Sequence, residues 1–238
     1  MIENALILAA GYGKRMENLT QNTPKPLLVV WGKTLLDHIL TKVVNAGIQR
    51  VMINVHYLAP QMKDYLLPWK ERIADLILIE EDEILGTGGT VTKACQFVEG
   101  QPFFVINGDV LWRERAGSAL HAMASSWQQT HTGLLALVGR EKAWGYDGNG
   151  DFFLDDDQAI VPKRNKHQVA PYVYAGIQIV HPAYADDHVA ASLRLTAPYP
   201  VNHLWQPQMQ KKELAGYVFP DPWYHVGTKK AYQAVGYV

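Results

Sequence analysis

The sequence predicts an α/β fold with a mostly parallel central sheet and helices on both faces, and three observations support this prediction. Residues 5–10 form a nearly continuous apolar run, the pattern of a strand covered on both sides. Strand-like and helix-like segments then alternate through the first half of the chain, as β-α-β crossovers require. No linker, internal repeat or low-complexity segment divides the 238 residues.

The first half of the chain shows the alternation most clearly. Residues 35–46 place aliphatic side chains at helical spacing, and Gly47 is a typical C-terminal cap. The other expected strands and helices of this half follow in turn. Strands are expected at 51–55, 76–80 and 103–106, and helices at 58–67 and 90–98.

The second half is less regular. Residues 148–161 predict a hairpin folded around Asp156 and Asp157. The remaining expected elements are helices at 118–129, from about 182 and from 229, and strands at 134–138, 172–180 and 217–219.

Composition and charge exclude several classes of protein. Hydrophobic residues make up 48% and charged residues 19%, which is the balance of a compact globular protein. The net charge of −1 gives no general attraction to nucleic acid or to anionic lipid, so neither is expected as a partner. The single cysteine, Cys95, excludes an internal disulfide and fits a reducing compartment. With no secretory signal or membrane span in the sequence, a cytoplasmic location is expected.

The segment after the first strand has the composition of a phosphate site. Gly11 and Gly13 let the backbone turn sharply and present N–H groups to an anion, while Arg15 and Lys25 supply positive charge. Pro24 and Pro26 flank Lys25, which predicts a stiff, extended segment there. A dinucleotide fingerprint fails because Met16 occupies the position of its third glycine, and no Walker loop occurs.

Two further segments predict ligand contacts. Asn107, Gly108 and Asp109 follow the strand at 103–106, which puts Asp109 at the carboxyl end of a central strand. A carboxylate at that position can hold Mg²⁺ against phosphate oxygens. Gly86, Gly88 and Gly89 open the helix expected next to it, which would let the backbone approach a base or a ribose.

The combined motifs resemble those of the sugar-1-phosphate nucleotidyltransferases. The segments that match stand in the family's order: LAAGYGKRM, TPKPLL, WGKTLLDHIL, INVHYL, LGTGG, NGDV, GDFFLD, YVYAGIQIVHP and WYHVGTKKAY. The resemblance covers essentially the whole chain and implies a single Rossmann-like catalytic domain over residues 1–238. It is greatest to the short N-acetylmuramic acid 1-phosphate uridylyltransferases of cell-wall recycling, which implies Mg²⁺-dependent transfer from UTP to that sugar phosphate.

The resemblance also implies roles for individual residues. Arg15, Lys25 and Asp109 would be catalytic, and Asp109 would hold magnesium. The nucleotide would lie against Ala9, Ala10, Gly11, Gly13, Arg15, Lys25, Thr87 and Gly88. The sugar phosphate would contact Asn107, Gly150 and Gly176.

The chain departs from the family at one expected metal ligand. The family places a second aspartate in the W-x-D-[VI]-G-T string, but here the string is WYHVGT, so His225 stands at that position. Imidazole is a poor ligand for Mg²⁺. Three consequences of this replacement are possible: the ion keeps an extra water, another carboxylate such as Asp221 binds the ion, or turnover is impaired. The extra water is the favoured interpretation.

Several alternatives remain open at this point. A guanylyltransferase acting on mannose or heptose 1-phosphate would use the same motifs. A catalytically impaired nucleotide-binding protein would explain His225, and an NAD-dependent oxidoreductase is supported by the glycine turn alone. The sequence predicts neither the base, the sugar nor the oligomeric state.

Overall fold

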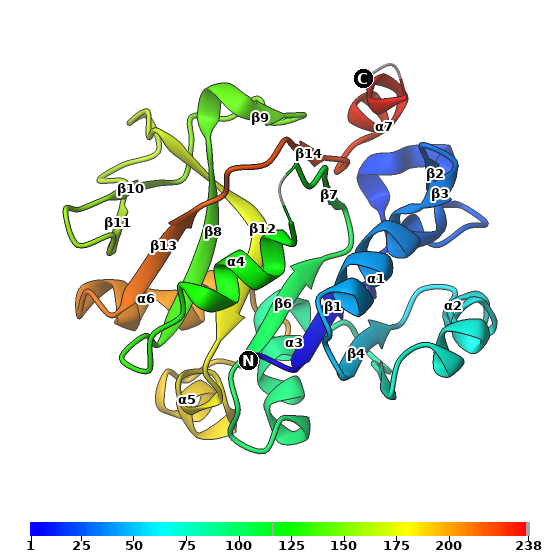
Figure 1. Cartoon of the computed structure of the whole chain (residues 1–238), viewed down its shortest axis with the longest axis horizontal. Helices are drawn as coiled ribbons and strands as arrows, with labels where there is room; N and C mark the ends of the chain where they lie inside the picture. Colours follow the sequence, from blue (N-terminus) through cyan, green and yellow to red (C-terminus); the bar gives the residue numbers. More distant parts are fainter. Residues whose placement is uncertain (116, 237–238) are drawn as a thin grey trace.

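The computed structural model of the chain describes residues 1–115 and 117–236 (Figure 1). Among these residues, nine strands form the main sheet. Seven of them follow the order β11-β10-β12-β6-β1-β4-β5, while β8 pairs with β12 and β13 pairs with β8. The strands are β1 Asn4–Leu8, β4 Arg50–Val55, β5 Asp75–Glu80, β6 Phe103–Asn107, β8 Gly133–Gly139, β10 Phe152–Leu154, β11 Ile160–Pro162, β12 Tyr172–Val180 and β13 Leu214–Val218.

The centre of the sheet is parallel, and this confirms the predicted fold class. Strands β1, β4, β5 and β6 run in one direction, so their carboxyl ends meet at one edge. Strand β12 joins antiparallel to β6 and to β8, and β13 pairs parallel with β8. The predicted hairpin is also confirmed, because β10 and β11 pair antiparallel around the turn at 155–159.

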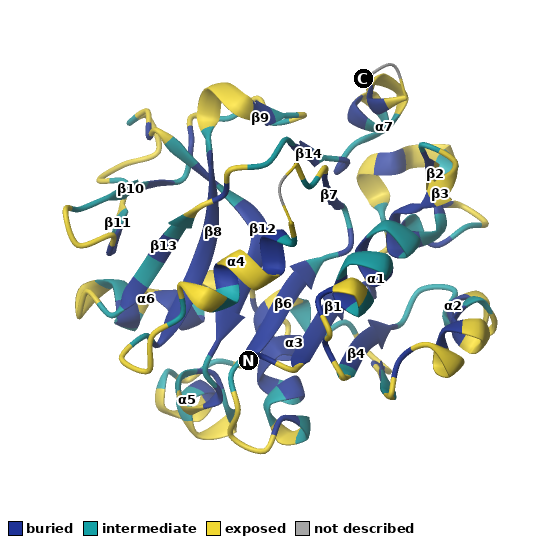
Figure 2. Cartoon of the chain, in the orientation of Figure 1, coloured by how far each residue is buried: buried dark blue, intermediate teal, exposed yellow. Residues whose placement is uncertain are grey.

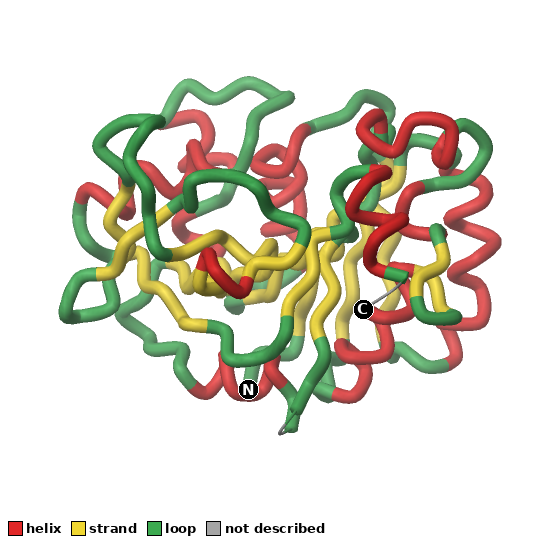
Figure 3. Tube along the Cα trace, turned by 90° about the horizontal axis from the view of Figure 1, so that it is seen from above, coloured by secondary structure: helices red, strands yellow, loops and turns green. Residues whose placement is uncertain are grey.

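Helices cover both faces of the sheet, as Figure 3 shows from above. One face carries α1 (Leu35–Asn45), α2 (Ala59–Leu66) and α4 (Ala119–Ser125). The other carries α3 (Gly86–Ala94), α5 (Asp187–Ser192) and α6 (Asn202–Gln210).

Alternate side chains of the central strands fill these two cores. On β6, Phe104 and Ile106 pack with α1 and α4, whereas Phe103 and Val105 pack with α3. All four side chains are almost completely buried, and Figure 2 shows the central strands as the most buried part of the chain. Burying a side chain of this size stabilises the fold by about 1.5–3 kcal/mol.

Two small sheets and the last helix lie above the carboxyl edge of the main sheet (Figure 1). One contains β7 (Val110–Trp112), β14 (Trp223–His225) and β9 (Ala143–Trp144); the other pairs β2 (Val29–Val30) with β3 (Lys33–Thr34). Helix α7 (Lys229–Val235) is fastened to the β2-β3 turn, because the Trp31 indole N–H donates to the Val235 carbonyl at 3.0 Å. The pairing of β14 with β7 places His225 opposite Val110.

Several expected boundaries are wrong by a few residues. Helix α3 covers 86–94 rather than 90–98, because the buried Glu81 carboxylate accepts from the Leu85 N–H and supports an earlier start. The first strand ends at Leu8, two residues before the expected end. The segment at Lys25 is a 3₁₀ turn, η2 (Lys25–Leu27), and not extended. The other 3₁₀ segments are η1 Lys14–Thr20, η3 Leu67–Glu71, η4 Cys95–Phe97, η5 Arg140–Lys142 and η6 Pro182–Tyr184, the last replacing the helix expected from 182.

In the part of the chain that the structure describes, no helix has the length and apolar character needed to cross a bilayer.

Candidate functional site

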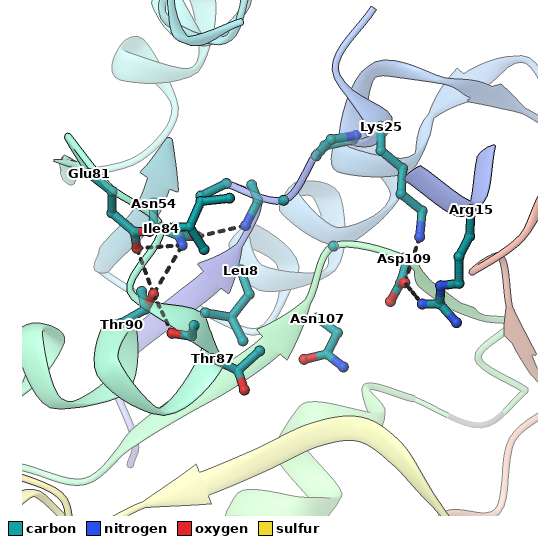
Figure 4. Close-up of a pocket in the computed structure, with 16 residues that line it drawn as sticks. Leu8, Arg15, Lys25, Asn54, Glu81, Ile84, Thr87, Thr90, Asn107 and Asp109 are labelled. Carbon is teal, nitrogen blue, oxygen red and sulfur yellow. Dashed lines mark hydrogen bonds and ion pairs between the residues drawn. The ribbon is translucent and has the colours of Figure 1, made fainter. Parts of the chain in front are cut away.

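A cavity of about 290 Å³ opens at the carboxyl edge of the central strands (Figure 4). Its walls come from the ends of β1 and β6, the loop after β1, the η2 turn and the first turns of α3. Ligands of open α/β sheets bind at such an edge. A larger hollow of about 590 Å³ lies at the other edge, beside Met1 and Gln101, where the strands begin.

The cavity brings together most of the residues predicted for the nucleotide. The residues of this set that line it are Ala9, Ala10, Gly11, Arg15, Lys25 and Thr87, and Asn107, predicted for the sugar phosphate, and Asp109, predicted for the metal, line it as well. The predicted residues outside its lining are Gly13, Gly88, Gly150, Gly176 and His225. The cationic loop and the Asn-Gly-Asp segment, about 90 residues apart in the sequence, therefore meet at one cavity.

One end of the cavity is charged. The Lys25 ammonium donates to Oδ2 of Asp109 at 2.6 Å, and a guanidinium nitrogen of Arg15 lies 4.0 Å from the same oxygen. The imidazole Nε2 of His225 is 3.6 Å from it. The side chain of Lys25 is 13% exposed and that of Asp109 is 19% exposed, whereas Arg15 is 65% exposed. Arg15 is thus the cation of this group that is most open to solvent.

Two neighbouring side chains keep Asp109 ionised. Burial alone would raise the pKa of this carboxyl, but the Lys25 ammonium and the adjacent His225 together hold the pKa well below its usual range. Asp109 is therefore an anion at every physiological pH, and its charge is available to a cation.

Backbone hydrogen bonds hold these groups in place. The Gly108 N–H donates to the Leu8 carbonyl at 3.0 Å, and the Val226 N–H donates to the Asp109 carbonyl at 2.8 Å. A side chain at Gly108 would lie 2.6 Å from that Leu8 carbonyl, so only glycine lets β6 end this close to β1. Gly13 has φ +64, and a Cβ there would contact Thr20 and Lys25. Gly13 thus shapes the turn that leads to Lys25 rather than the cavity wall.

The opposite end of the cavity contains a buried polar network that the sequence reasoning missed. The Ala9 N–H donates to Oδ1 of Asn54 at 2.6 Å, and the Asn54 amide donates to Oε1 of Glu81 at 2.8 Å. The Thr90 hydroxyl donates to the same oxygen at 2.6 Å, and the Leu85 N–H donates to Oε2 at 3.0 Å. This network connects the ends of β1, β4 and β5 with the start of α3, as the dashed lines in Figure 4 show.

The glycines of α3 pack against protein. A Cβ at Gly86 would lie 2.6 Å from the Tyr199 carbonyl, and one at Gly88 would lie 2.5 Å from the Tyr199 ring. The Gly88 N–H donates to the Tyr199 carbonyl at 2.9 Å. Gly88 therefore lies close to the segment before α6, and its contact with a base stays a prediction. Gly86 and Thr87 do line the cavity.

The residues predicted for the sugar phosphate fall into two places. Gly176 has φ +72 at the irregularity in β12, and a Cβ there would lie 3.0 Å from the Asn107 amide nitrogen, so these two residues are neighbours. Gly150 has φ +71 and packs against Ala170 instead. Its carbonyl accepts from the Lys163 ammonium at 2.8 Å. Lys163 is a cation beside the predicted sugar site that the sequence reasoning also missed.

The side chains near Asp109 offer few ligands to a Mg²⁺ ion. Among the described residues, no three His, Cys, Asp or Glu side chains gather closely enough to hold a metal. Asp221 does not reach in, because its Oδ1 accepts from the Arg115 N–H. The Asp109 carboxylate does fit, since Mg²⁺ commonly binds through one carboxylate together with substrate phosphates.

Comparisons with known proteins agree with this geometry. The chain matches the Nucleotidyl transferase family over residues 4–237. It is 32% identical to N-acetylmuramate alpha-1-phosphate uridylyltransferase of Caulobacter vibrioides, over 95% of this chain and 93% of that protein. The enzyme of the same name from Neisseria meningitidis serogroup B is also 32% identical, over 94% of this chain and 93% of its own length.

Solved structures share the fold. UDP-glucose pyrophosphorylase complexed with UDP-glucose superposes with a TM-score of 0.80 at 20% identity, covering 100% of this chain and 98% of that one. This likeness supports the same α/β architecture over the full length.

Proposed function

The chain belongs to the Nucleotidyl transferase family, and on this premise we propose that it transfers the uridylyl group of UTP to a sugar 1-phosphate. The proposed acceptor is N-acetylmuramic acid 1-phosphate, and the products are the UDP-sugar and pyrophosphate. Two relatives bear the name of this activity and match the chain over nearly all of both lengths. In a cell, the reaction would return a cell-wall sugar to biosynthesis.

The observation that carries the proposal is the meeting of Lys25, Arg15 and Asp109 at one end of a cavity of about 290 Å³. A nucleoside triphosphate needs a shaped wall with hydrogen-bonding groups for its base and cations for its phosphates. The cavity offers both, because the Asn54 network lies at one end and the charged cluster at the other. A cation and a phosphate charge about 4 Å apart attract by about 4 kcal/mol at an effective dielectric of about 20.

The reaction needs no general base from the protein. An oxygen of the sugar phosphate attacks the α phosphorus of UTP and forms the new P–O bond, while the bond from that phosphorus to the bridging oxygen breaks and releases pyrophosphate. A phosphate monoester has a second pKa of about 6, so its oxygen is already ionised near neutral pH. The protein contributes alignment and neutralisation of charge.

Each residue has a distinct part in this mechanism. Lys25 lies deepest and would neutralise the α phosphate, while the exposed Arg15 would bind the phosphates that leave. Asn107 and Gly176 would orient the sugar phosphate on the other side. Asp109 would hold a divalent cation, which supplies further neutralisation of the phosphate oxygens.

Pyrophosphate release tests this proposal. The protein is incubated with Mg²⁺ or Mn²⁺, one of UTP, GTP, CTP or ATP, and one of several sugar 1-phosphates. The expected result is the highest kcat/KM with UTP and N-acetylmuramic acid 1-phosphate. Highest activity with GTP and mannose or heptose 1-phosphate would make the protein a guanylyltransferase, and no release with any pair would contradict the enzyme proposal.

A further inference from the structure

His225 is the unusual residue of the charged end, and its place is fixed by a strand. It is the last residue of β14 and pairs with Val110 of β7. The next residue, Val226, donates its N–H to the Asp109 carbonyl at 2.8 Å. The backbones of His225 and Asp109 are therefore held together by sheet hydrogen bonds and not by a mobile loop.

The side chain of His225 is also held in one orientation. Its ring stacks on the Trp223 indole, with an interplanar angle of 11° and centroids 6.0 Å apart. Nε2 faces Oδ2 of Asp109 at 3.6 Å, and the His225 side chain remains 23% exposed. The nitrogen thus points at the carboxylate from a position that solvent can reach.

The distance between Nε2 and Oδ2 distinguishes two roles for the pair. At 3.6 Å the atoms are too far apart for a hydrogen bond. A single metal ion about 2.1 Å from a nitrogen and an oxygen fits between two donors at this separation. The pair therefore has the spacing of two ligands that share one ion.

The chemistry of the two donors selects among ions. Mg²⁺ prefers oxygen ligands, whereas first-row transition ions accept imidazole nitrogen together with carboxylate. A neutral imidazole coordinates through a ring nitrogen, and Nε2 is the one that faces Asp109. The phosphates of a bound nucleotide would supply the remaining ligands, because no third protein ligand lies close by among the described residues.

An ion at this position would also free the lysine. Without it, the Lys25 ammonium is bound to Asp109 at 2.6 Å. With a divalent cation on the carboxylate, the Lys25 ammonium would lose this partner and would be able to turn to a phosphate oxygen. Binding of the cation and binding of the phosphates would then depend on each other.

We infer that Asp109 and Nε2 of His225 form a mixed carboxylate–imidazole site that binds Mn²⁺ or Co²⁺ in preference to Mg²⁺. The inference rests on the proposed function in one respect, namely that nucleotide phosphates complete the coordination of the ion.

Pulsed EPR on bound Mn²⁺ tests the nitrogen ligand directly. The full-length protein is mixed with Mn²⁺ and α,β-methylene-UTP, which cannot react and carries no nitrogen in its phosphate chain. The electron spin-echo should show modulation from a coordinated ¹⁴N. His225→Asp should abolish this modulation while Mn²⁺ still binds. His188→Ala, which removes an exposed histidine on α5, is the matched control and should leave the modulation unchanged.

Calorimetry with the same proteins measures the ion preference. The ratio of the Mg²⁺ to the Mn²⁺ dissociation constant should fall at least about 10-fold in His225→Asp, since an oxygen donor then replaces the nitrogen. Mn²⁺ that binds wild type without ¹⁴N modulation, or an unchanged ratio, would overturn the inference.

The two proposals can fail separately. Pyrophosphate release by a protein that shows no nitrogen signal leaves the proposed function intact and removes only the ion site. If the UTP analogue does not bind, the proposed function is contradicted, and the ion site is then judged from Mn²⁺ alone with the same three proteins. If Mn²⁺ alone does not bind to the wild-type protein, the inference of the ion site is overturned as well.

Discussion

The two ends of the cavity are built in different ways. At the Glu81 end, a buried carboxylate accepts from Asn54, Thr90 and the Leu85 N–H, and Glu81 is only 5% exposed. At the Asp109 end, three groups of positive or potentially positive charge approach one carboxylate oxygen, and Arg15 is 65% exposed.

The difference teaches which part of the site exists before a ligand arrives. Hydrogen bonds to a buried carboxylate are assembled when the chain folds, because leaving such groups unpaired costs about 1–3 kcal/mol or more. The ion pairs of the charged end can exchange partners when phosphate or a cation enters. We therefore expect the Glu81 end to affect stability together with binding, and the Asp109 end to affect mainly catalysis.

The largest effect is expected at the charged end. Lys25→Ala should lower kcat/KM at least about 100-fold, as removal of a preorganised charge partner does in other active sites. The measurement is pyrophosphate release at saturating metal. Lys211→Ala, which removes an exposed lysine after α6, is the matched control and should keep the wild-type rate. A wild-type rate in Lys25→Ala would remove the lysine from the mechanism.

At the Glu81 end, the main expected effect of a substitution is a loss of stability. Glu81→Ala removes one acceptor of the Asn54 amide, which keeps its bond to the Thr90 hydroxyl, and removes the acceptor of the Leu85 N–H. The free energy of unfolding should therefore fall by about 1–3 kcal/mol. Nucleotide affinity should weaken as well, because Asn54 also accepts from the Ala9 N–H. Urea unfolding and calorimetry measure the two quantities. Glu83→Ala, at an exposed position, should change neither, and a Glu81 variant of wild-type stability would disprove the role of the network.

Gly11→Ala separates folding from binding. A Cβ at Gly11 meets no atom within 4 Å, so stability should stay within about 0.5 kcal/mol of wild type. The added methyl group would, however, project from the cavity wall at the place where the nucleotide is expected to lie. The affinity for UTP should therefore fall by about 10-fold. Calorimetry measures the affinity of both proteins for UTP. Unchanged affinity would mean that the ligand does not approach this loop.

The pH dependence of stability is expected to be the smallest effect. The folded-state pKa of Asp109 is depressed, so its stabilising contribution is present above the ordinary value of about 3.9 and is lost as pH falls below it. The free energy of unfolding of wild type should therefore decrease more steeply below about pH 4 than that of Asp109→Asn. Equal slopes in urea titrations at several pH values would show that the cations do not stabilise this carboxylate.

The sequence was sufficient to predict the charged end. Gly11 and Asp109 follow the ends of β1 and β6 closely, and the parallel sheet brings these two ends to one edge, where Lys25 of the η2 turn also lies. The pairing of β14 with β7 was not predicted, because three-residue strands carry too little pattern to be recognised. Yet this pairing places His225 beside Asp109.

The Glu81 end could not be predicted for a different reason. Asn54 lies in β4, which also contains Arg50, and Glu81 follows the end of β5, so nothing local shows that the two side chains meet. Only the long-range contacts of the folded chain bring them to Thr90 and Ala9. The packing of Gly88 against Tyr199 could not be predicted for the same reason, since Tyr199 is more than 100 residues away.

A crystal structure of the protein with α,β-methylene-UTP and Mn²⁺ tests the central claim most directly. We expect the base beside Gly86 and Thr87 and the triphosphate between Gly11, Arg15 and Lys25, with the ion on Asp109. A nucleotide bound elsewhere, for example in the hollow beside Met1 and Gln101, would contradict it.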